Sequence, residues 1–159
     1  MIRELVDLYV NSGFVKVELR TGDTITSTIP AVAHELLREG SSLCDDFRIG
    51  PEKLVEYIWL ERRQPDLRPV PRDLYIKARL SMYENVLKGD DRTVRNIQTN
   101  LRELVQQRLR KILTAIAMNP DIVITREFLE KLTYEEEVLV RQIACLVKDW
   151  LTYVLGLTK

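Results

Sequence analysis

The pattern of apolar and polar positions changes near residue 50. Residues 14–19 alternate between apolar and polar side chains, as a half-buried strand does, and residues 24–29 are rich in β-branched side chains. The turn-forming sequence at 20–23 separates these segments, so the pattern predicts a β-hairpin. A short helix is predicted to follow at 31–39. Because a hairpin and one helix bury little apolar surface, we expect this small β-rich module to pack against a larger domain.

Helical periodicity begins at Gly50 and continues almost to the C-terminus. The predicted helices cover residues 51–64, 72–88, 91–118 and a final stretch that ends near 155. The proline-rich sequence between the first two must be extended, because proline disfavours helix at and before its own position. The final helix should begin at a capping box, since Thr133 and Glu136 have the required spacing.

These elements define the expected fold class, which is mainly α. A helical bundle is preceded by the small β-rich module, and the expected domains are residues 1–49 and residues 50–159.

The apolar faces of two predicted helices are unusually wide. On a helical wheel, the apolar side chains of helix 72–88 span about 160°, and those of the last helix span a similar arc. A helix that lies on a single neighbour needs a stripe of only about 100°. Either the chain's own helices cover the remaining apolar surface, or a partner subunit covers it.

Arg108 projects into the middle of an apolar face of the long helix 91–118. Burial of a lone guanidinium is costly, so this side chain should have a carboxylate partner. The wheel of the last helix places Glu136 on the apolar side of its first turn. We therefore expect Arg108 to pair with Glu136, or with an acid of a partner subunit, and to fix the register of the bundle.

The same long helix carries a basic stripe on its polar face. The stripe comprises Arg92, Arg95, Arg102 and Arg110. Each arginine could neutralise a DNA phosphate, but no aromatic side chains interleave with them as base-stacking platforms. A solvated or protein-facing surface is therefore the favoured interpretation, and a nucleic-acid-binding module is the alternative.

Composition and motifs argue against an enzyme. The 24 basic residues balance the 24 acidic ones, and the sequence has neither a phosphate-binding glycine loop nor a catalytic serine or zinc motif. His34 is the only histidine, and Cys44 and Cys145 lie in unrelated contexts. We expect no catalytic, cofactor or metal site. The apolar runs are too short to cross a bilayer, which favours a soluble intracellular protein without a membrane partner.

The order and spacing of several short motifs resemble the GINS family of DNA replication proteins, from about residue 15 to residue 155. These motifs are Pro51-Glu52-Lys53-Leu54, Glu61-Arg62, Pro69-Val70-Pro71 with Tyr75, Arg108-Leu109-Arg110-Lys111-Ile112, and Leu132-Thr133-Tyr134-Glu135-Glu136. The placement of a β-rich module before the helices resembles the archaeal two-three class, which is related to the eukaryotic partner-of-Sld-five subunits two and three. Residues 1–49 would then be a B-domain and residues 50–159 a helical A-domain.

The resemblance implies a non-enzymatic scaffold without a cofactor. Its expected partners are a complementary GINS subunit in a two-plus-two heterotetramer, the MCM helicase and a RecJ-like replication protein, with weak DNA contact at most. The implied location is the archaeal cytoplasm at the nucleoid, or the nucleus of a eukaryote. The candidate subunit contacts are Leu80, Tyr83, Leu87, Trp150 and Val154.

Overall fold

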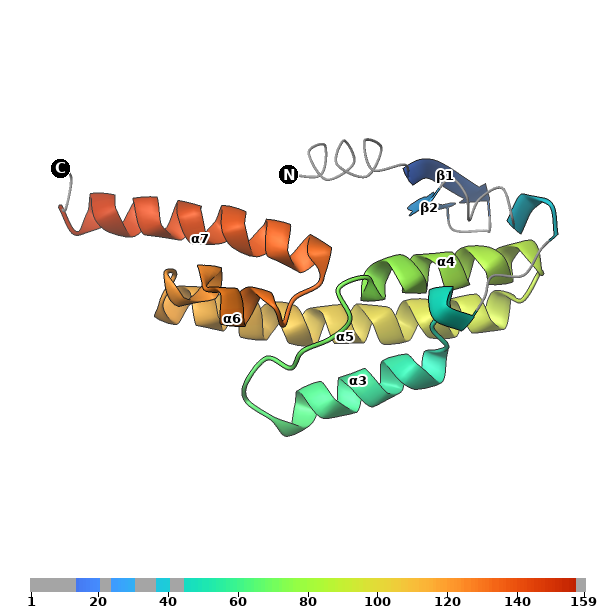
Figure 1. Ribbon diagram of the computed structural model, residues 1–159, viewed down its shortest axis with the longest axis horizontal. Helices are drawn as coiled ribbons and strands as arrows, with labels where there is room; N and C mark the ends of the chain where they lie inside the picture. Colours follow the sequence, from blue (N-terminus) through green and yellow to red (C-terminus); the bar gives the residue numbers. More distant parts are fainter. Residues whose placement is uncertain (1–13, 21–23, 31–36, 41–44, 157–159) are drawn as a thin grey trace.

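The computed structural model describes residues 14–20, 24–30, 37–40 and 45–156. A small antiparallel hairpin lies beside an elongated, mainly helical body whose longest element runs through its middle (Figure 1). The mainly helical fold class and the helical bundle are as predicted from the sequence.

The hairpin consists of β1 (Phe14–Arg20) and β2 (Thr24–Pro30), paired in register from Phe14 opposite Pro30 to Arg20 opposite Thr24. The backbone of β2 lies against helix α4 (Leu74–Leu87), and Figure 1 shows the hairpin beside that helix. The two strands occupy the segments that the sequence pattern predicted as strands. Most of the predicted helix at 31–39 lies outside the described residues.

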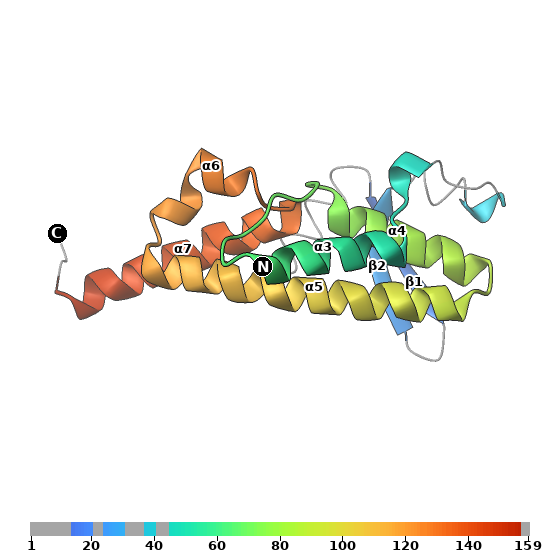
Figure 2. The ribbon, with the colours of Figure 1, turned by 90° about the horizontal axis from the view of Figure 1, so that it is seen from below.

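The main bundle is built on α5 (Asp91–Met118), which occupies the predicted range. Helices α3 (Pro51–Arg63) and α4 both pack along α5, as both views show (Figures 1 and 2). The turn from α4 to α5 needs a left-handed residue, and Gly89 supplies it with a φ of 71°. Asp90 then caps α5, because its carboxylate accepts a hydrogen bond from the Thr93 backbone amide.

The remaining elements are short until the last helix. A 3₁₀ turn, η1 (Asp45–Phe47), precedes α3, and η2 (Ile122–Ile124) and α6 (Arg126–Leu129) follow α5. Helix α7 (Tyr134–Val154) begins at the predicted capping box: the Glu136 amide donates to the Thr133 hydroxyl, and the Thr133 amide donates to the Glu136 carboxylate.

The apolar core has two parts that lie along α5. The first includes Leu54, Ile58, Leu74, Ala78, Ile97 and Leu104 from α3, α4 and the first half of α5. The second includes Ile112, Ile116, Val123, Leu132 and Val140 from the second half of α5 and from η2 to α7. Arg108 stands on α5 between Leu104 and Ile112, at the junction of the two parts.

Helix α7 packs on the body through its residues up to Lys148, since Val147 lies against the second part of the core and Lys148 pairs with Asp121. Beyond Ala144, which is buried, large apolar side chains of α7 are mostly exposed. The C-terminal end of α7 extends past the end of α5 in both views (Figures 1 and 2). The fold therefore leaves an apolar helix face in solvent.

Candidate functional site

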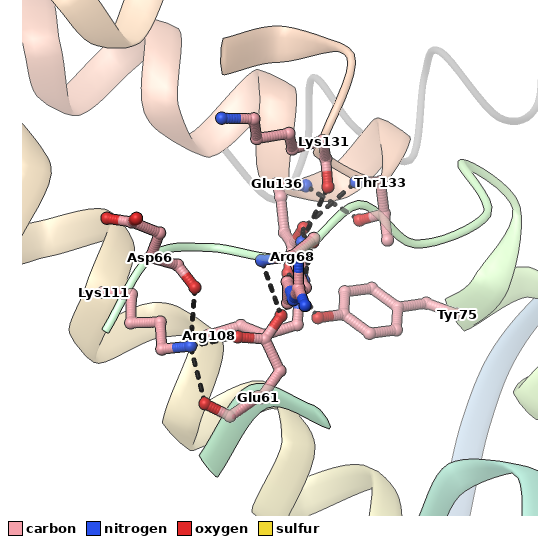
Figure 3. Close-up of polar contacts among 9 residues, drawn as sticks. All are labelled: Glu61, Asp66, Arg68, Tyr75, Arg108, Lys111, Lys131, Thr133 and Glu136. Atoms are coloured by element: carbon pink, nitrogen blue, oxygen red, sulfur yellow. Dashed lines mark hydrogen bonds and ion pairs between the residues drawn. The ribbon is translucent and has the colours of Figure 1, made fainter. Parts of the chain in front are cut away.

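A buried polar cluster joins the two parts of the core, and Arg108 is its centre (Figure 3). The Arg108 side chain is fully buried. Its Nε and Nη2 donate to the two Glu136 carboxylate oxygens over 2.7 and 2.8 Å. Nη1 donates to Glu61 and to the Arg68 carbonyl, and Nη2 also donates to the Lys131 carbonyl. All five N–H donors of the guanidinium therefore have acceptors.

Glu136 is held by more than the predicted arginine. Its Oε1 accepts a 2.5 Å hydrogen bond from the Tyr75 hydroxyl, and its Oε2 accepts the Thr133 amide of the capping box. The same carboxylate thus starts helix α7, neutralises Arg108 and anchors α4 through Tyr75. The predicted Arg108–Glu136 pair is confirmed, and it forms within one chain.

Sequence reasoning missed the second half of the cluster. Glu61, at the end of α3, is 1% exposed and binds Arg108 through Oε1 and the Lys111 ammonium through Oε2. Lys111 Nζ also donates to the backbone carbonyls of Glu61 and Asp66, over 2.7 and 2.9 Å. The spacing of Leu54, Ile58 and Glu61 places all three on the inner face of α3, and this was the available signal.

The electrostatics of the cluster favour the charged form of Arg108 and the neutral form of Tyr75. Burial alone would lower the pKa of Arg108, but the hydrogen bonds and charge of Glu136 outweigh it and raise that pKa further above its usual value. Burial, together with the neighbouring Glu136 carboxylate, raises the pKa of the Tyr75 hydroxyl. Two cations face two carboxylates, so the cluster is balanced. With its donors committed to the fold, Arg108 is a structural group that sets helix positions.

The basic stripe lies on the solvent side of α5. Arg92, Arg95, Arg102 and Arg110 are all exposed. Next to them, Arg62 of α3 and Glu103 of α5 form an ion pair across the two helices. The structure brings the four arginines to one solvent-facing side of α5.

Two of the predicted subunit contacts require correction. Leu80 is completely buried and Tyr83 is 4% exposed, and burial raises the pKa of the Tyr83 hydroxyl. The reason is that α4 lies between α5 on one side and β2 on another, so the chain itself covers most of the wide apolar arc of this helix. These two residues belong to the protomer's interior. Leu87, near the end of α4, remains 49% exposed.

The C-terminal part of the apolar arc of α7 has no such cover among the described residues. Trp150 is 60% exposed and Val154 is 55% exposed, in line with the prediction that they are available for contacts. Leu146 and Tyr153, which were not singled out from the sequence, are 69% and 78% exposed. Their spacing of three and four residues places these side chains on one side of the helix. We call Leu146, Trp150, Tyr153 and Val154 the α7 face.

The histidine and the two cysteines do not form a site among the described residues. His34 and Cys44 lie outside the described residues, and Cys145 is an exposed free thiol. Within the described ranges, no group of three or more histidine, cysteine or acidic side chains is arranged to hold a metal. None of the described helices combines the length and apolarity needed to cross a membrane.

Comparison with known proteins identifies the helical part of the chain. No curated protein matches the sequence. The family model Sld5, the GINS complex protein helical bundle domain, matches residues 49–155. This range contains α3 to α7 and therefore the whole Arg108 cluster and the α7 face. Because the match covers more than half of the chain, the protein belongs to the GINS family of DNA replication complex proteins.

Proposed function

We propose that this protein is a non-enzymatic GINS subunit that assembles with a complementary GINS subunit through the α7 face. Membership of the family implies partnership with other GINS subunits in a replication complex. The observation that supports α7 as the contact is its row of exposed apolar side chains in a helix that extends beyond the body. Contiguous exposed apolar surface of this kind marks interaction sites in soluble proteins.

The energetic argument rests on the aromatic residues of that face. Trp150 and Tyr153 are both more than half exposed. An aromatic side chain buries about 150–250 Å² when it is fully covered, and each Å² of apolar surface contributes roughly 25 cal/mol. Covering the two rings would therefore contribute several kcal/mol. Aromatic anchors of this type commonly dominate binding energy at protein interfaces.

The finer assignment follows the sequence resemblance. We infer that the chain is of the archaeal two-three class, with residues 1–49 as its B-domain and residues 50–159 as its A-domain. The assembly would be a two-plus-two heterotetramer that links the MCM helicase to a RecJ-like partner during DNA replication. Such a complex would act in the archaeal cytoplasm at the nucleoid, or in the nucleus of a eukaryote. The hairpin before α3 supports this domain order.

Co-expression with a complementary GINS subunit tests the proposal. The wild-type pair should co-purify and elute as one discrete complex in size-exclusion chromatography with light scattering. Leu146→Glu places a charge on the α7 face and should abolish co-purification. Val55→Glu is the matched control, because Val55 is 50% exposed on α3. A stable wild-type monomer that does not bind the other subunit, or equal effects of the two variants, would contradict the proposal.

A second function is supported by the exposed arginines of α5. If the stripe binds DNA, affinity should fall steeply with salt, and replacing Arg92, Arg95 and Arg102 by alanine should reduce that salt dependence. Fluorescence anisotropy with labelled single-stranded and duplex DNA measures both quantities. Weak DNA binding that these replacements do not change would exclude the DNA-binding function and leave the scaffold function as the only proposal.

A further inference from the structure

A groove at the far end of α5 adjoins the Arg108 cluster, with which it shares Lys111, and is separate from the α7 face. It has a volume of about 550 Å³, within the range of about 300–1,000 Å³ that is typical of ligand sites. Its apolar walls come from the proline-rich linker, α5, η2 and α6. These wall residues are Leu67, Ala115, Met118, Ile122 and Phe128, and we call this hollow the Ile122 groove.

The apolar walls of the groove are open to solvent. Met118 is 82% exposed and Ile122 is 53% exposed, whereas Leu67 is buried. No residue of α7 lines the groove. A subunit seated on the α7 face alone would leave this surface open to a different occupant.

The charges around the groove determine the chemistry of that occupant. Three cations, Arg110, Lys111 and Lys131, line the groove, and Asp66 is the one carboxylate among its lining residues. Lys111 is already committed to Glu61 and to backbone carbonyls. Arg110 is exposed and, in the part of the chain that the structure describes, forms no ion pair. Lys131 only approaches Glu127, at 4.0 Å on the surface.

We propose that the Ile122 groove binds a short acidic peptide segment with bulky apolar side chains, contributed by a protein outside the GINS assembly. The apolar side chains enter between Met118, Ile122 and Phe128, and the acids face Arg110 and Lys131. This arrangement combines two common modes of peptide recognition, an apolar groove and basic side chains that select acids. It extends the scaffold function, because one face holds the complementary subunit and another recruits a client.

The direct test is fluorescence anisotropy with the full chain and a fluorescein-labelled peptide in which glutamates alternate with leucine and phenylalanine. We expect a Kd of about 10–100 μM, which corresponds to a modest peptide interface. Raising the salt concentration should weaken binding several-fold, because the rim charges are exposed. An analogue with lysine in place of glutamate, and one with serine in place of the apolar residues, should not bind.

Variants locate the binding surface. Ile122→Glu and Arg110→Glu should each weaken binding by about tenfold or more, with unchanged circular dichroism because both side chains are exposed. Arg92→Glu is the matched control: it changes the net charge equally but lies 18 residues away on α5, about 27 Å by helical rise. Its affinity should match that of the wild type.

Three outcomes would overturn the inference. The first is no binding of the acidic peptide. The second is equal loss in Arg92→Glu and Arg110→Glu, which would indicate attraction by overall charge alone. The third is loss of the complementary GINS subunit from Ile122→Glu, which would make the groove part of the subunit interface. Leu146→Glu is tested by co-purification of the GINS subunit, and Ile122→Glu by binding of the acidic peptide. Failure of the scaffold proposal is therefore distinguishable from failure of this one.

Discussion

Arg108 of α5 and Glu136 of α7 meet as two parallel forks, with Nε to Oε1 at 2.7 Å and Nη2 to Oε2 at 2.8 Å. Bidentate geometry of this kind fixes the relative rotation of the two groups as well as their distance. Since both side chains are buried, removing either one leaves the other charged in the interior without its bidentate partner. The pair therefore specifies how α7 begins on α5.

The first prediction concerns this cluster. Arg108→Met keeps an unbranched apolar stem but removes the guanidinium, and so leaves Glu61 and Glu136 without their shared cation. We expect a loss of about 3–5 kcal/mol in the free energy of unfolding, measured by urea denaturation. Arg102→Met, on the exposed side of the same helix, should change stability by less than about 0.5 kcal/mol. Similar losses in both variants would show that the cluster contributes no more to stability than an exposed arginine does.

The second prediction concerns pH. The pKa of the Tyr75 hydroxyl is raised in the folded protein, so its neutral form is favoured there and its contribution is fully present below the unfolded pKa of about 10. Stability should fall as the pH rises above about 10. Tyr75→Phe should lose about 1–3 kcal/mol at neutral pH and should show a shallower decline between about pH 9 and 11.

Urea denaturation across this pH range measures the effect. Tyr153→Phe is the control, because Tyr153 is 78% exposed on the α7 face. It should reproduce the wild-type pH dependence. If Tyr75→Phe has the same slope as the wild type above pH 10, the hydroxyl does not carry the predicted linkage.

The third prediction compares two threonines at helix starts. Thr133→Ala removes the hydroxyl that accepts the Glu136 amide, and should cost about 1 kcal/mol of stability. Thr125→Ala is the comparison, because the exposed Thr125 precedes α6 but makes no side-chain cap bond to it. Its cost should be clearly smaller. Thermal unfolding followed by circular dichroism distinguishes them, and equal shifts in Tm would argue against the capping box.

The fourth prediction separates interior from surface on α4. Leu80→Ala should cost about 2–5 kcal/mol, because the side chain is fully buried and its removal leaves a cavity. Leu87→Ala should cost less than about 1 kcal/mol, since that side chain is 49% exposed. Denaturant titration of both variants provides the comparison. A small loss at Leu80 would reinstate that residue as a candidate contact.

These contrasts show which features of the fold and of the site can be predicted from sequence patterns. The range of α5 and the capping box of α7 depend on neighbours along the chain, so local spacing predicts them. The Arg108–Glu136 pair was predictable because each charge interrupts an apolar stripe that must be buried. Glu61 interrupts the inner face of α3 in the same way, but it stands next to Arg62 and Arg63 at the helix end, where charges are ordinary.

The width of an apolar arc was a weaker guide to which side chains form subunit contacts. It indicates how much surface needs cover, and only tertiary structure says what provides it. For Leu80 and Tyr83 the cover comes from the chain itself, whereas for Trp150 and Val154 it does not. The docking of β2 on α4 and the Ile122 groove arise from contacts between distant segments, which no local pattern encodes.

The projecting end of α7 has a consequence for how the protein must be made. A chain that leaves the ribosome without its counterpart would display Trp150 and Tyr153 to every chaperone and protease it meets. Under the proposed function, cells would need to synthesise the two subunits together, and any surplus of this one would be removed.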